Sequence, residues 1–180
     1  MKTHPHAKHQ RGITLIEAGI VLAVVATLAA GAAPSMQSVI DTRRLEGTAA
    51  QLAGDIRWAR SEAIARNAAL RLRLQPAAGG GCYVIHTSAT DECTCLAAGP
   101  AQCSGAAEAI KTVALSRADR VTLQSNVASM RFDPLHGTST PTGTLRVIGA
   151  NERAIHHVVN IMGRVRSCSP QAAVRGYAAC

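Results

Sequence analysis

The sequence predicts an α+β protein, in which one long N-terminal helix precedes a small antiparallel β domain. Three observations predict this class: an apolar run at residues 13–33, an apolar stripe with helical spacing that continues to residue 67, and a period of two from Leu70 onward. The chain has 180 residues, of which 47% are hydrophobic and 2% aromatic. It is therefore long enough for one domain with an appended helix, with a core made of Leu, Val, Ile and Ala.

The apolar run at residues 13–33 contains a single charge, Glu17. About 20 apolar residues span the hydrocarbon core of a bilayer. Residues 1–12 are basic, which predicts that they stay cytoplasmic and that the rest faces outward. A cleaved signal peptide ending near Ala33 and a plain single-pass anchor both fit this pattern. A carboxylate in an apolar segment raises the free energy of inserting that segment into a membrane, so the presence of Glu17 indicates that this residue has a specific role.

Residues 35–67 are expected to continue the helix beyond Pro34, which should loosen it locally because proline lacks an N–H. One apolar stripe recurs at spacings of three and four and should face a sheet or neighbouring subunits; it consists of Leu45, Ala49, Leu52, Ile56, Ala59 and Ala63. Charges of both signs predict a mostly solvated opposite face, formed by Asp41, Arg43, Arg44, Asp55, Arg57, Arg60, Glu62 and Arg66. Asn67 is a plausible helix stop.

From Leu70 the alternation of leucine and arginine predicts a half-buried strand at residues 70–74. A glycine-rich turn at 76–81 follows, and 88–107 is expected to be a loop. Further strands, all in one antiparallel sheet, are expected at residues 83–87, 112–115, 121–123, 129–132, 144–148 and 154–161.

All six cysteines lie beyond residue 80, at Cys82, Cys93, Cys95, Cys103, Cys168 and Cys180. An even number of cysteines without metal-ligand spacing predicts disulfides formed in an oxidising compartment. We expect Cys168 to pair with Cys180 and close the C-terminal tail, whereas the pairing of the other four stays open. The sequence contains no G-x-S-x-G, Walker, H-E-x-x-H or G-x-G-x-x-G motif. We therefore predict no enzymatic activity, no cofactor and no metal.

Residues Gly12-Ile13-Thr14-Leu15-Ile16-Glu17 after a basic leader are similar to the class III signal of type IV pilins and type II secretion pseudopilins. The resemblance implies that a prepilin peptidase cuts after Gly12 and N-methylates Ile13. It also implies that Glu17 neutralises the amine of a neighbouring subunit during filament assembly. The implied partners are other pilin subunits, the peptidase and the inner membrane, with the C-terminal domain in the periplasm.

The same resemblance divides the chain into four parts. They are a leader at 1–12, a transmembrane and filament-core helix at 13–34, an amphipathic half-helix at 35–67 and a periplasmic antiparallel β domain at 68–180. Residues 129–134 and 158–166 resemble the GspH/FimT branch of minor pilins and pseudopilins.

Gly163-Arg164-Val165-Arg166 resembles the G-R-x-R element of FimT-type minor pilins, which implies contact with double-stranded DNA during natural transformation. Glycine permits a tight bend. In an extended segment Arg164 and Arg166 share one face, where guanidinium groups can engage phosphate. Arg175 is expected to extend this patch, and Arg146 and Arg153 are further candidates.

The chain carries a formal charge of +8, and 16 of its 19 basic residues are arginine. An excess of arginine favours binding to phosphate groups, but a positive net charge is also typical of proteins that bind anionic membranes or that use it only to stay soluble. The alternative function is therefore a structural pseudopilin of a type II secretion system that binds no DNA. In that case Arg164 and Arg166 would pair with Asp133, Glu152 or a neighbouring subunit.

Overall fold

A single helix, α1 (Leu15–Arg66), forms the N-terminal part of the protein in the computed structural model, which describes residues 14–88, 90–95 and 100–180 apart from the side chains of residues 32–34. The chain divides into two units, Met1–Val39 and Ile40–Cys180. Gly12 and Ile13 lie outside the described residues. The helix ends where predicted, because Asn67 adopts a left-handed φ of 49°.

In the first unit, the helix is long and apolar enough to cross a membrane. Its large apolar side chains, such as Leu15 and Leu22, are exposed. Glu17 lies in the first turn and is exposed, and its backbone N–H donates to Thr14 Oγ1 at 3.4 Å. An unburied apolar surface of this kind needs lipid or other helices around it.

In the second unit, the predicted stripe of α1 is confirmed, because all six of its residues are at most 1% exposed. The prediction of a solvated charged face was wrong for two residues. Asp41 is buried and pairs with Arg120 Nε at 3.1 Å. Asp55 is buried and accepts from Lys111 Nζ at 2.6 Å and from the Tyr83 hydroxyl at 2.7 Å. Their partners come from distant segments, so helical spacing alone could not reveal them.

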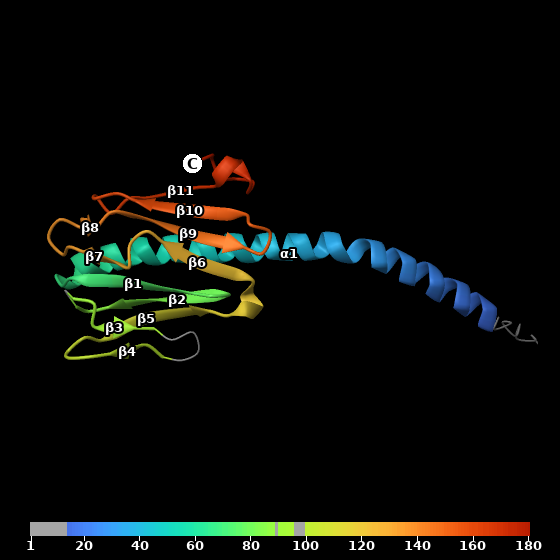
Figure 1. Cartoon of the computed structure of the whole chain (residues 1–180), viewed down its shortest axis with the longest axis horizontal. Helices are drawn as coiled ribbons and strands as arrows, with labels where there is room; N and C mark the ends of the chain where they lie inside the picture. Colours follow the sequence, from blue (N-terminus) through green and yellow to red (C-terminus); the bar gives the residue numbers. More distant parts are fainter. Residues whose placement is uncertain (1–13, 89, 96–99) are drawn as a thin grey trace, which may run out of the picture. The chain divides into compact units, whose positions relative to one another are not determined.

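The strands form two main antiparallel sheets and a small ribbon (Figure 1). The five-stranded sheet has the order β5-β2-β1-β7-β8, with bounds Ala109–Leu115, Gly80–His86, Leu70–Ala77, Ser129–Phe132 and Ser139–Thr140. The four-stranded sheet has the order β11-β10-β9-β6, with bounds Val165–Cys168, Ala154–Val159, Gly143–Gly149 and Val121–Ser125. The ribbon pairs β3 (Cys93–Thr94) with β4 (Gln102–Cys103), and two short 3₁₀ helices are η1 (Arg117–Asp119) and η2 (Pro170–Ala172).

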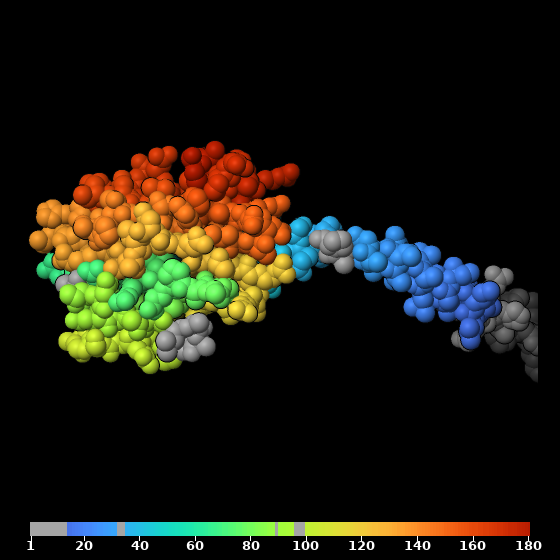
Figure 2. Space-filling view, viewed as in Figure 1, coloured from blue at the N-terminus to red at the C-terminus, as the bar shows by residue number. Residues whose placement is uncertain are grey.

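The expectation of one sheet was therefore wrong. Strand β6 belongs to the four-stranded sheet, where it pairs with β9, although it also contacts β1 and β2 of the first sheet. The residues of the β domain, coloured green to red in Figure 2, pack together in one unit with residues 40–66 of the helix. The main core lies where the α1 stripe meets both sheets.

Several strand limits also differ from the prediction. Strand β1 continues through Pro76, which pairs with Gly81 of β2. Proline is tolerated there because β7 pairs only with residues 70–73, which leaves that edge of β1 open. The predicted loop 88–107 contains β3 and β4, and the strand expected at 154–161 ends at Val159.

Strand β2 is buried on both faces. Tyr83 and Ile85 belong to the main core, whereas Cys82 and Val84 belong to a second, small core beside the ribbon. Disulfides join Cys82 to Cys95 and Cys93 to Cys103. The four cysteines whose pairing the sequence left open thus form one bridge from β2 to the ribbon and one bridge between the two strands of the ribbon.

Candidate nucleic-acid interface

The G-R-x-R segment begins in the turn between β10 and β11, whose register pairs Val159 with Val165. Asn160 organises the turn. Its carbonyl accepts from the Gly163 N–H at 2.9 Å, and its side-chain oxygen accepts from the Arg164 N–H at 2.9 Å. Gly163 has a φ of 70°, a left-handed conformation that glycine adopts without strain. The turn therefore holds the backbone of Arg164 in a fixed position.

A second reason for glycine at 163 is the close approach of Arg60 from α1. A Cβ added at Gly163 would lie 2.6 Å from Arg60 Cδ and 2.9 Å from the Gly137 carbonyl oxygen. Arg60 Nε donates to that same carbonyl at 2.7 Å. Gly163 thus leaves room for an arginine that ties α1 to the loop between β7 and β8.

Arg164 and Arg166 are both exposed, and Val165 between them is half-buried and packs on the main core. Among the described residues, neither arginine forms an ion pair. Asp133 instead has its Oδ1 3.2 Å from His136 Nδ1. A hydrogen bond from the His136 backbone N–H lowers the pKa of the Asp133 carboxyl group. Both guanidinium groups are therefore available to an external anion.

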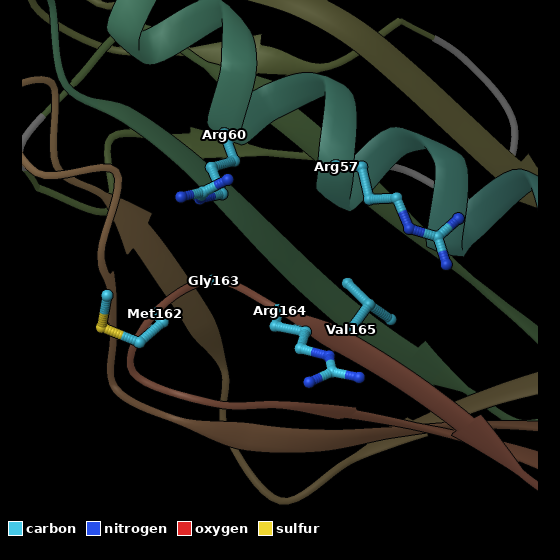
Figure 3. Close-up of a pocket in the computed structure, with 6 residues that line it drawn as sticks. All are labelled: Arg57, Arg60, Met162, Gly163, Arg164 and Val165. Atoms are coloured by element: carbon cyan, nitrogen blue, oxygen red, sulfur yellow. The ribbon is translucent and has the colours of Figure 1, made fainter.

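A groove of about 440 Å³ separates this segment from α1. Figure 3 shows Arg57 and Arg60 reaching out from the helix, and Arg164 and Val165 on the strand across from them. Met162 and Gly163 complete the lining, so none of the lining residues that the structure describes is acidic. Arg57 and Arg60 were predicted only as part of a solvated face. Their spacing of three residues, which places both on one side of a helix, was the available signal.

The structure does not bring the other predicted arginines to this groove. Arg175 is exposed in the C-terminal tail. Arg153 Nη1 donates to Thr42 Oγ1 at 2.9 Å. Arg146 lies opposite His156 in the β9–β10 register, and burial, together with the charge of Arg146, lowers the pKa of that histidine.

A disulfide joins Cys168 at the end of β11 to Cys180, and within this closed tail Val174 is buried against the main core.

The two adjacent histidines of β10 face opposite sides, as an extended strand requires. His157 is buried, with Nδ1 2.9 Å from Ser167 Oγ, and burial lowers its pKa to about 4. Among the described residues, no group of three His, Cys, Asp or Glu side chains could hold a metal ion.

A long apolar N-terminal helix, whose second half packs on antiparallel sheets, is the fold of pilin-like subunits. The model of the family described as Type II transport protein GspH matches residues 48–163, and the chain belongs to this family of structural pilins and pseudopilins. No curated protein matches the chain.

The chain is similar to the type IV minor pilin FimU of Pseudomonas aeruginosa strain PAO1, whose crystal structure was solved in two space groups. One gives a TM-score of 0.53 at 18% identity, covering 72% of this chain and 94% of FimU. The other gives 0.49 at 17% identity, covering 70% and 97%. At this identity the first match shows a common fold.

Proposed function

We propose that the chain is a minor pilin of a type IV pilus that binds double-stranded DNA without sequence preference, for DNA uptake in natural transformation. One observation carries the proposal: Arg164 and Arg166 are exposed, flank a half-buried valine, and form no ion pair among the described residues. An arginine without a carboxylate partner keeps its donors available for two-point contacts with phosphate.

The site favours phosphate over bases. The arginines lie on a turn and an edge strand, and contacts to the phosphate backbone carry no sequence information. Aromatic residues make up only 2% of the chain, so stacking of unpaired bases has little support. Binding should therefore weaken steeply as the salt concentration rises.

The N-terminal part of the proposal concerns processing. A prepilin peptidase removes residues 1–12, cutting after Gly12, and N-methylates Ile13. Glu17, exposed in the first turn of α1, then neutralises the amine of a neighbouring subunit. Before assembly, the helix anchors the chain in the inner membrane with its C-terminal unit in the periplasm.

Intact-mass measurement of the protein extracted from its native membranes tests this processing. The expected mass corresponds to a chain that begins at N-methylated Ile13. A chain that begins near Ala33 would mean ordinary secretion through a signal peptide, and would refute the pilin-type assembly of Glu17.

A second candidate function is supported by the family itself, whose description is Type II transport protein GspH. In this candidate the chain is a structural pseudopilin, and Arg164 and Arg166 contact a neighbouring subunit instead of DNA. Both candidates share the fold, the anchor and the processing, so DNA binding separates them.

The deciding experiment is a mobility-shift titration of the full chain in non-ionic detergent with duplex DNA at several salt concentrations. Arg164→Ala/Arg166→Ala should abolish most binding, and any residual binding should have a salt slope smaller by about two. The matched control is Arg43→Ala/Arg117→Ala, which removes two exposed arginines that do not line the groove.

Loss of binding in the first variant and its retention in the control would support the DNA-binding minor pilin. Equal binding and equal salt slopes in both variants would refute the site. No binding by the folded, oxidised wild-type chain would favour the structural pseudopilin.

A further inference from the structure

We propose that the groove between α1 and β11 is a phosphate-binding site in which Arg57 and Arg60 act together with Arg164. Within the proposed function, on which this assignment of the ligand rests, the phosphate is one of the DNA backbone. Arg57 and Arg60 thus add phosphate contacts from the helix to those that the G-R-x-R segment makes.

The charge of the groove is the first argument. Three arginines line it, and the other described lining residues are Met162, Gly163 and Val165. Three arginines and no acidic residue among the described lining give the groove a positive potential, which favours the entry of an anion. Arginine forms two parallel hydrogen bonds with a phosphate oxygen pair, which makes phosphate the matching class of ligand.

The orientation of the two helix arginines is the second argument. Arg60 is held by its hydrogen bond from Nε to the Gly137 carbonyl and by its packing over Gly163. Little conformational entropy remains to be lost when its terminal nitrogens bind an anion. Arg57 lies near enough to β10 that its charge, after burial, contributes to the lowered pKa of His157.

The size and lining of the groove are the third argument. Its volume of about 440 Å³ exceeds that of a phosphate group and leaves space for an attached sugar. Met162 and Val165 offer apolar contacts to that sugar. Arg166 is exposed but does not line the groove, so it can report on DNA contacts made outside the groove.

The test uses inorganic pyrophosphate as the probe for the groove and duplex DNA as the probe for the full interface. Calorimetric titration of the full chain in non-ionic detergent at low salt should show pyrophosphate binding. Arg57→Gln should weaken it by at least about tenfold, because a charged hydrogen-bond donor is lost. Arg57→Lys should restore part of the affinity, since it restores the charge without the bidentate geometry.

Arg166→Gln is the matched control outside the groove. It should leave pyrophosphate binding unchanged and still weaken DNA binding. Arg57→Gln should weaken both, and should reduce the salt slope of DNA binding by about one. Because Arg57 is exposed, the variant should remain folded, which the fluorescence of Trp58 checks.

Two results would overturn the proposal without touching the proposed function. One is a wild-type chain that binds DNA through Arg164 and Arg166 but binds no pyrophosphate. The other is an Arg57→Gln chain that loses pyrophosphate yet keeps its DNA affinity, which would assign the groove to a free phosphate. Failure of the proposed function is different: it is the absence of DNA binding by the wild-type chain.

Discussion

Replacing Gly163 by alanine should destabilise the protein by about 2–3 kcal/mol, from two separate costs. The left-handed φ of 70° costs an alanine about 1–2 kcal/mol. The new methyl group would lie 2.6 Å from Arg60 Cδ, so Arg60 must move and lose its bond to the Gly137 carbonyl. That half-exposed hydrogen bond contributes about 1 kcal/mol.

Gly176 provides a matched control, because its φ is 86° and an added Cβ would meet nothing within 4 Å. Gly176→Ala should therefore show the backbone cost alone. The free energy of unfolding is measured by urea titration in mild detergent, followed by the fluorescence of the single tryptophan, Trp58, which is half-buried against the main core. Adding Arg60→Ala to each variant completes a double-mutant cycle.

The double-mutant cycle has a definite expected result. Gly163→Ala must cost more than Gly176→Ala, and the excess must fall when Arg60 is already alanine, although the close approach of the new methyl group to the Gly137 carbonyl oxygen, at 2.9 Å, remains. Equal costs for the two glycine variants would refute the contact between Arg60 and Gly163 as an energetic feature.

Three further predictions use the same urea titration. Leu52→Ala, at a side chain of the α1 stripe with 0% exposure, should cost about 2–5 kcal/mol; a smaller loss would mean that the stripe is not the centre of the core. The pKa of His157 is lowered from 6.5 to about 4, so stability is complete above pH 6.5 and falls by about 3 kcal/mol as the pH drops to 4. His157→Gln should remove that part of the acid slope, and an unchanged slope would contradict it. Cys168→Ala/Cys180→Ala opens a short loop and should cost about 3 kcal/mol, with faster proteolysis of the tail as a second readout.

The sequence predicted the helix and its buried face because both depend on local periodicity. The spacing of Leu45 to Ala63 identified the stripe without knowledge of what it packs against. The period of two identified most strands, but not the division into two sheets. That division depends on which strand β6 joins, and pairing is a long-range choice that side-chain alternation does not encode.

The candidate site was predicted in part for the same reason. Gly163 and the alternation of Arg164 and Arg166 are local features of a turn and a strand. Arg57 and Arg60 lie more than 100 residues earlier, and only tertiary packing brings them to the same groove. Sequence also could not show that Asp41 and Asp55 would be buried, since each is stabilised by a cation from a distant segment.

The ribbon of β3 and β4 has a consequence for how this protein can vary and be labelled. Two bridges fasten the ribbon, and no residue in the described part of its small core also belongs to the main core. We therefore expect insertions between Cys95 and Gln102 to leave intact the packing beneath α1 and the groove lined by Arg57, Arg60 and Arg164. Such an attachment point should tolerate natural sequence variation, and it should equally accept an epitope or fluorophore with which to locate the protein in living cells.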